Sequence, residues 1–259
     1  MADFTNEDLS GSRFERVDLT GSEFVDTDLS RSVFRGVEMR DVVMRGVELC
    51  EVHIDGEFQH LVLNGVDVAP LVEAELDRRE PDRAKMRPTD PAGFRDAWDI
   101  VERRWAATVD RARGLDPALL HESVDGEWSF IETLRHLAFA TDAWVGRAIL
   151  GDPSPWHPLE LPWDGMPDTP GIPRDRSVRP SLDDVLALRH DRMATVRRVI
   201  EGLTDESLAD HTEPVEGDGW PPSRSFEVRE CLLVVLKEEW HHRLFAERDL
   251  GRLEAAARD

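Results

Sequence analysis

The sequence predicts a two-domain protein, in which a β-type repeat domain precedes a bundle of four helices. Large apolar residues recur every five positions up to residue 54, a period that fits neither an α-helix nor a simple strand. From residue 92 onward the apolar residues follow the spacing of an amphipathic helix. Residues 80–91 are rich in proline and charge and show no period, which is typical of a linker. We therefore predict domains at residues 1–65 and 93–259. A short helix and linker at residues 66–92 join them.

The N-terminal domain is defined by its repeat. Eleven apolar residues stand in register: Phe4, Leu9, Phe14, Leu19, Phe24, Leu29, Phe34, Met39, Met44, Leu49 and Ile54. A small or β-branched residue stands two positions before most of them, and an acidic residue often lies in between. This pattern resembles the pentapeptide-repeat family, whose chains wind into a right-handed quadrilateral β-helix with four repeats in each coil. The resemblance implies that the apolar side chains point inward, with Phe24 in the middle of a buried column.

The rest of the chain is predicted to be helical. Eleven repeats make fewer than three coils, so the open end needs a cap, and residues 66–79 look like a short helix able to provide it. Four longer helices follow at about residues 92–113, 129–150, 181–200 and 226–250, with a capping box at Ser129 and Glu132. The segment at residues 151–180 contains eight prolines, and its length favours a lid or wall of a functional site. Four helices with one long crossover are typical of a bundle whose ligands project inward.

Three residues of the predicted bundle have the chemistry and spacing of a metal site. Glu238 and His242 are four apart on one helix, so their side chains lie on the same face. His136, on the second long helix, is the best third ligand. Glu239 is an alternative to Glu238, because it is three residues from His242 and also lies near that face of the helix. A Glu/His pair on a helix is by itself more often a solvated pair than a metal site. His241 points about 100° away from His242, which favours a surface role.

Short motifs in the bundle resemble the DinB-like superfamily. They are EWS at residues 127–129, LRHL at residues 134–137 and EEWHHR at residues 238–243. The resemblance implies a metal site with one histidine on the second helix and an i, i+4 pair on the fourth. A glutamate in the first position of that pair is similar to the mycothiol-dependent maleylpyruvate isomerase branch, whose ligand set is His, Glu, His. This implies a transferase or isomerase that activates a low-molecular-weight thiol such as mycothiol against an electrophilic small molecule.

Two imidazoles and one carboxylate favour Zn²⁺, with Ni²⁺, Fe²⁺ or Mn²⁺ as alternatives, and leave a position open for a thiol or water. The two cysteines, Cys50 and Cys231, lack any metal or redox spacing, and Cys231 is interpreted as core. Trp128 and Trp240 are likewise interpreted as core residues. We name no catalytic residue beyond the three metal ligands and no substrate-binding residue.

The composition limits the partners. There are 54 acidic against 32 basic residues, and a net charge of -22 argues against direct nucleic acid binding or attraction to an anionic membrane. No apolar stretch could span a bilayer and the N-terminus is unlike a signal peptide, so a cytoplasmic protein is expected. The oligomeric state stays open, with a homodimer as one alternative. The competing function is a non-enzymatic interaction protein, because some acidic pentapeptide-repeat proteins mimic DNA on topoisomerases. Residues 1–79 carry 18 acidic residues against 8 arginines.

Overall fold

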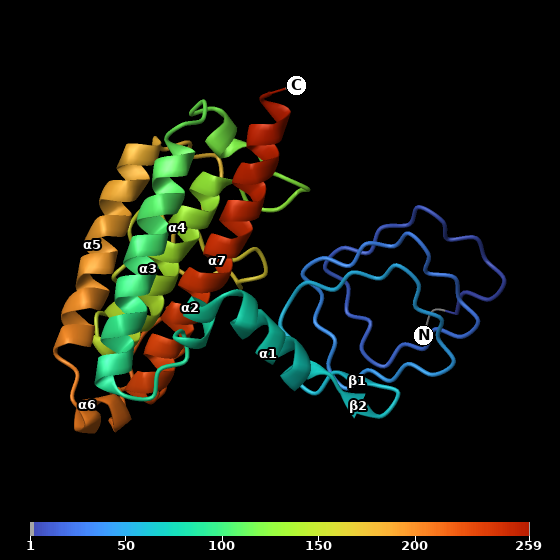
Figure 1. Cartoon of the computed structure of the whole chain (residues 1–259), viewed down its shortest axis with the longest axis horizontal. Helices are drawn as coiled ribbons and strands as arrows, with labels where there is room; N and C mark the ends of the chain where they lie inside the picture. Colours follow the sequence, from blue (N-terminus) through green and yellow to red (C-terminus); the bar gives the residue numbers. More distant parts are fainter. Residues whose placement is uncertain (1–2, 259) are drawn as a thin grey trace. The chain divides into compact units, whose positions relative to one another are not determined.

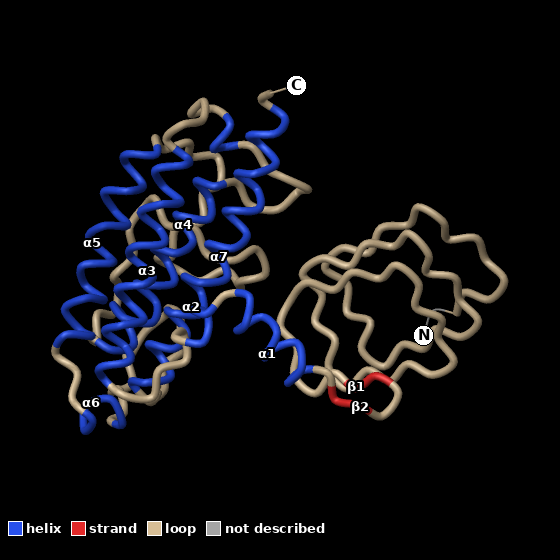
Figure 2. Tube along the Cα trace, in the orientation of Figure 1, coloured by secondary structure: helices blue, strands red, loops and turns tan. Residues whose placement is uncertain are grey.

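The computed structural model describes residues 3–258 of the chain. The chain divides into two compact units, which we name the repeat unit (Met1–Gly56) and the bundle unit (Glu57–Asp259). Helices occur only in the bundle unit among the described residues, as Figure 2 shows. The boundary between the two units lies earlier in the chain than the predicted linker at residues 80–91.

The repeat unit turns at a regular five-residue interval. A residue with left-handed backbone stands at every fifth position from Asn6 (φ 59°) to Gly56 (φ 155°), each two residues after an apolar residue of the repeat. The acidic residues of the repeat stabilise these turns, because carboxylates such as those of Asp8, Asp18 and Asp28 accept backbone N–H groups two positions on. Hydrogen bonds from Ser10 and its counterparts lower the pKa of these exposed carboxyl groups. The five-residue period is therefore a period of turns.

The apolar side chains of the repeat unit are not buried. Phe24, predicted to fill a buried column, exposes 62% of its surface, so this prediction is wrong for the structure described here. Burial would require successive coils to stack about 4.8 Å apart through a ladder of backbone hydrogen bonds. In residues 3–56 the hydrogen bonds join only residues two or three apart, and no strand forms. The quadrilateral β-helix therefore stays a prediction.

The bundle unit begins with a hairpin and two short helices, followed by the long helices (Figure 1). The elements in chain order are β1 (Val62–Leu63), β2 (Val66–Asp67), α1 (Ala69–Arg79), α2 (Pro81–Ala84), α3 (Pro91–Ala112), the 3-10 helix η1 (Leu119–His121), α4 (Phe130–Thr141), the π-helix η2 (Asp142–Ile149), α5 (Leu182–Glu201), α6 (Asp205–Ala209) and α7 (Val228–Ala256). The antiparallel pair β1 and β2 is joined by Asn64 and Gly65, both with positive φ, as a two-residue hairpin requires.

Local signals explain where the long helices begin. The Asp90 side chain accepts the Gly93 N–H at the start of α3, and Ser129 and Ser181 form capping boxes at the starts of α4 and α5. The four predicted helices are confirmed as α3, α4 with η2, α5 and α7. Two features differ from the prediction: the second helix changes to π geometry at Asp142, and α7 continues to Ala256.

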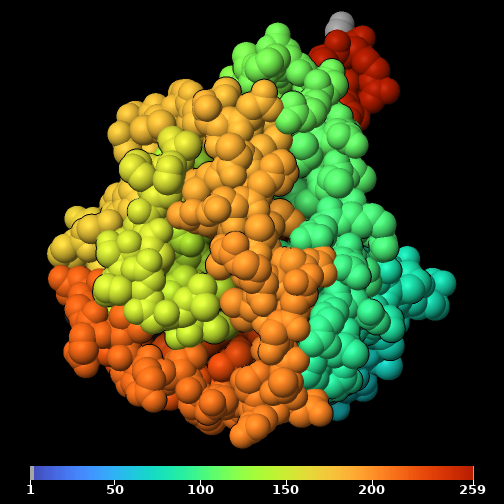
Figure 3. Space-filling model, turned by 90° about the vertical axis from the view of Figure 1, so that its left-hand side faces the viewer, coloured from blue at the N-terminus to red at the C-terminus, as the bar shows by residue number. Residues whose placement is uncertain are grey.

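The four long helices pack around one apolar core. α3, α4, α5 and α7 lie side by side in Figure 1, and Figure 3 shows α5 (orange) against α3 (green) on one face of the unit. Phe94, Trp98, Leu134, Val235 and Trp240 are among the buried residues that these helices contribute. None of the helices in the described residues combines the length and the apolar character needed to cross a bilayer.

Ion pairs join residues 80–91 to neighbouring helices of the bundle unit. Arg83 of α2 contacts Glu73 at 2.7 Å and Asp77 at 2.6 Å, both on α1. Arg104 of α3 contacts Asp82 at 2.7 Å. The segment predicted as a linker thus contains the helix α2 and packs through charged groups against its neighbours.

Candidate metal centre

His136, Glu238 and His242 converge at one point between α4 and α7. His242 Nε2 lies 3.0 Å from Glu238 Oε2, and His136 Nε2 lies 3.4 Å from the same oxygen. One ligand atom from each of the three residues can be chosen so that all lie within 4.8 Å of one another. They form the single such group of His, Cys, Asp or Glu side chains in the described part of the chain. The structure therefore brings together the three residues that the sequence proposes as ligands.

The helices determine which side chains face this point. Glu238 and His242 are one helical turn apart on α7, which places both on the face toward α4. Glu239, the next residue, faces α5 instead, where its two oxygens each accept a 2.8 Å hydrogen bond from Arg189. This pair is almost fully buried and fixes the orientation of α7 about its axis. Glu239 is thus engaged elsewhere, which removes the alternative of Glu239 as the ligand.

His241 also lies away from the three residues, as expected. Its Nδ1 is 3.5 Å from Glu57 Oε1, and Lys237 contacts the same carboxylate at 2.5 Å. Burial lowers the pKa of His241, and Glu57 partly opposes this. His241 therefore offers a matched control for His242, because it is the same residue type on the same helix outside the site.

The three side chains differ in their access to solvent. His136 exposes 8% of its side chain, His242 19% and Glu238 31%, so the open side of the site lies over Glu238 and His242. Burial lowers the pKa of His136 and so favours its neutral form. Burial acts to raise the pKa of Glu238, but the neighbouring His136 and His242 rings outweigh this and hold that pKa well below its usual range. At neutral pH the site therefore contains a carboxylate beside a neutral imidazole.

The tautomer of His136 follows from its outer hydrogen bond. Its Nδ1 lies 3.0 Å from the carbonyl oxygen of Leu161, and only an N–H can pair with a carbonyl. In the neutral ring the hydrogen is then on Nδ1, and Nε2 presents a lone pair to the Glu238 carboxylate. Two acceptors facing each other at 3.4 Å repel unless a proton or a metal cation lies between them. This donor set, with its histidine oriented by a backbone carbonyl, fits a divalent metal ion.

The segment that carries Leu161 is held by Arg135, a buried arginine next to His136 in the sequence. Arg135 is fully buried and donates to the carbonyls of Leu159 at 2.6 Å, Asp175 at 2.6 Å and Val178 at 3.3 Å. The Leu161 N–H in turn donates to the Arg135 carbonyl at 3.4 Å. Residues 151–180 were predicted as a lid or wall, and this anchoring makes them a wall.

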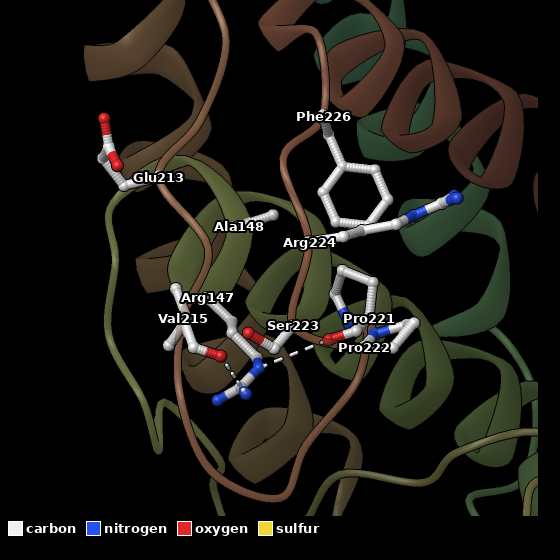
Figure 4. A pocket seen from close by; sticks show the side chains of 9 residues that line it. All are labelled: Arg147, Ala148, Glu213, Val215, Pro221, Pro222, Ser223, Arg224 and Phe226. Atoms are coloured by element: carbon white, nitrogen blue, oxygen red, sulfur yellow. Dashed lines mark hydrogen bonds between the residues drawn. The ribbon is translucent and has the colours of Figure 1, made fainter.

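A second buried arginine holds the neighbouring segment. Arg147 donates to the carbonyls of Pro153 at 2.7 Å, Val215 at 3.0 Å and Gly217 at 2.8 Å, and Figure 4 shows its hydrogen bonds to Val215 and Pro221. A Cβ at Gly219 would lie 2.6 Å from this guanidinium, so only glycine allows the approach. This segment carries Trp220, which packs against Trp163 of the wall at 4.9 Å between ring centroids.

Aromatic rings surround the imidazoles. The Trp128 ring stacks on His242 with 10° between the planes and lies 4.5 Å from the His136 ring. Phe245 meets His242 edge-on at 6.0 Å, and Phe139 lies 6.1 Å from His136. Trp128 is half-buried, so its interpretation as a core residue is wrong. Its place in the EWS motif beside the helix that carries His136 is the signal that could have revealed it.

The remaining candidates agree with their sequence interpretation. Trp240 is buried in the core. Cys231 is fully buried, and desolvation raises its pKa to about 12, so it supplies no thiolate at neutral pH. Cys50 is exposed in the repeat unit.

Comparison with known families agrees with this arrangement. The model of the DinB superfamily matches residues 100–246, which is more than half of the chain and includes all three candidate ligands. The chain therefore belongs to the DinB superfamily. A model of pentapeptide repeats matches residues 2–36 in eight copies, which confirms the fusion of a repeat segment with a DinB domain. No curated protein and no solved structure matches the chain.

Proposed function

We propose that the bundle unit binds one divalent metal ion through His136, Glu238 and His242 and uses it to activate a small thiol. The observation that carries this proposal is the pair of acceptors, His136 Nε2 and Glu238 Oε2, 3.4 Å apart in a site that is largely shielded from water. DinB-like domains bind metals in general, which supports the same assignment.

The donor set favours Zn²⁺ over harder ions. Two imidazole nitrogens and one carboxylate oxygen are typical ligands of Zn²⁺, and Ni²⁺, Fe²⁺ and Mn²⁺ accept the same set. Three protein ligands leave at least one position for an exogenous group. When bound, such an ion lowers the pKa of a thiol or water that ligates it.

The surrounding residues bind and orient a small molecule. Trp128 and Phe245 present aromatic surfaces beside His242, on the more open side of the site. The Arg176 guanidinium, which forms an ion pair with Asp164, lies 6.0 Å from the centroid of the Trp128 ring. Cys231, the cysteine of the bundle unit, is buried and its pKa is raised, so it supplies no nucleophilic thiolate, which favours a thiol supplied from solution.

The ligand set favours the thiol-dependent branch of the family. Glu238 stands in the first position of the helical pair, which is similar to the ligand pattern of the mycothiol-dependent maleylpyruvate isomerase branch. We therefore propose a transferase or isomerase that uses a low-molecular-weight thiol such as mycothiol and an electrophilic small molecule. The repeat unit has no assigned part in this reaction.

A thiol panel tests this proposal. Protein purified without an affinity tag is loaded with Zn²⁺ and offered mycothiol and other small thiols, each with maleylpyruvate or a haloaromatic electrophile. We expect adduct or isomer formation that falls by at least about tenfold when a chelator removes the metal. A catalysed rate that the chelator leaves unchanged would contradict the role of the metal, and the absence of any rate above the uncatalysed reaction across the whole panel would favour a non-enzymatic interaction protein.

A further inference from the structure

The buried carboxyl group of Glu160 has no hydrogen-bond partner in the described part of the chain. Glu160 exposes 0% of its surface, and neither of its carboxyl oxygens accepts a hydrogen bond. Two charged side chains face it, Asp142 at the start of η2 and Arg192 of α5. An ionised carboxylate that is buried without hydrogen bonds is strongly unfavourable.

The charges around Glu160 do not balance if both carboxyl groups are ionised. Arg192 donates a hydrogen bond from Nε to Asp142 at 2.9 Å, whereas its Nη2 lies 3.7 Å from the nearer Glu160 oxygen, too far for a hydrogen bond. Its Nη1 is bound to Asp191 at 2.7 Å. One guanidinium charge is therefore shared by three carboxyl groups, the buried Asp142 and Glu160 and the exposed Asp191. A proton shared between Asp142 and Glu160 removes the excess negative charge.

We propose that Glu160 is a positioning residue that carries a proton at neutral pH, donates it to Asp142, and so holds the Leu161 carbonyl against His136. The last step rests on the proposed function, since it assigns Glu160 a role at the same metal centre. Burial, reinforced by Asp142, raises the pKa of Glu160 well above its usual range, and Arg192 opposes this less strongly. Protonation turns two facing acceptors into a donor and an acceptor.

A hydrogen bond from Glu160 to Asp142 would connect the wall to η2 at the residue that precedes Leu161. Arg192 of α5 contacts the same Asp142 side chain, so α5 is joined as well. Leu161 supplies the carbonyl that fixes the His136 tautomer, so its placement sets the direction of the Nε2 lone pair. The wall lies close to η2 at Pro155. A Cβ added at Gly146 of η2 would be only 3.0 Å from Pro155 Cβ. Arg192 adds a 3.3 Å bond to the Pro155 carbonyl. The wall residues 155–161 are thus held at both ends of a short stretch.

The pH dependence of unfolding tests the proton. In metal-free protein, the folded state keeps a proton that the unfolded state loses above about pH 4.3. As the pH rises, the unfolding equilibrium constant of the wild type should therefore increase relative to that of Glu160→Gln, whose neutral amide can donate to Asp142 without titrating. The quantity to follow is the ratio of the wild-type constant to the Glu160→Gln constant. We expect this ratio to rise by at least about tenfold between pH 5 and pH 7. Glu122→Gln, at an exposed loop position, should leave the wild-type pH dependence unchanged.

Zn²⁺ affinity, measured by competition with a chromophoric chelator, tests the positioning role. Glu160→Gln should bind Zn²⁺ within about threefold of the wild type, whereas Glu160→Ala should bind about 10 to 100 times more weakly. A flat ratio between pH 5 and pH 7, or a Glu160→Gln affinity as low as that of Glu160→Ala, would overturn the inference. Absence of Zn²⁺ binding in the wild type would instead contradict the proposed function, and the chelator-treated unfolding series would still decide whether Glu160 holds the proton.

Discussion

Replacing His136 by alanine is expected to lower Zn²⁺ affinity by at least about 100-fold and to abolish thiol-dependent activity. His136 is the most buried of the three candidate ligands, and its ring is oriented by the Leu161 carbonyl before any ion binds. Without it, Glu238 and His242 form only a pair one turn apart on a single helix, which binds a divalent ion weakly. Calorimetric titration of the full chain measures the affinity, and circular dichroism checks that the variant is folded.

His241→Ala is the matched control for this prediction. It removes the same side chain from α7, but His241 lies beside Glu57 rather than beside Glu238. We expect it to keep at least about half of the wild-type metal content and activity. Full metal content in His136→Ala, or equal losses in the two variants, would contradict the assignment of the site.

Replacing Arg189 by alanine is expected to lower the free energy of unfolding by about 3 to 5 kcal/mol, because it leaves a buried charge unpaired. Arg189 and Glu239 expose only 2% and 1% of their side chains and are joined by two hydrogen bonds of 2.8 Å. The Arg189 guanidinium also lies 5.8 Å from the Trp105 ring. Urea denaturation at pH 7 measures the change.

Two controls separate the charge effect from the loss of a side chain. Arg113→Ala breaks an exposed pair with Asp183 and should cost less than about 1 kcal/mol. The double variant Arg189→Met with Glu239→Leu removes both charges while keeping volume, so it should recover most of the stability lost in Arg189→Ala. A cost below about 1 kcal/mol for Arg189→Ala would show that the pair contributes little.

Local rules predicted the helices and the candidate ligands. Capping residues such as Ser129 and Asp90 act within one turn, and Glu238 and His242 share a face through helix geometry alone. The prediction of His136 as the third ligand required only that two amphipathic helices of one bundle pack together. These features could be predicted because they depend on neighbours in the sequence or on the class of fold.

Features that depend on distant partners could not be predicted. Glu239 is an alternative to Glu238 in the sequence pattern, and its hydrogen bonds with Arg189, 50 residues earlier, are what remove that alternative. The half-buried position of Trp128 and the anchoring of the wall by Arg135 depend on how loops fold over the bundle. In the repeat unit, burial of Phe24 depends on hydrogen bonds between coils, which a five-residue period does not guarantee.

The metal content of the folded, untagged full-length chain tests the central claim most directly. After incubation with Zn²⁺ and extensive dialysis, we expect about one divalent ion per chain by elemental analysis. X-ray absorption should show nitrogen and oxygen ligands at about 2.0 to 2.2 Å. Glu238→Ala, treated in the same way, should retain little of this metal. A folded wild-type chain with less than about 0.1 ion, or a Glu238→Ala variant that retains the full amount, would contradict a metal centre at these three residues.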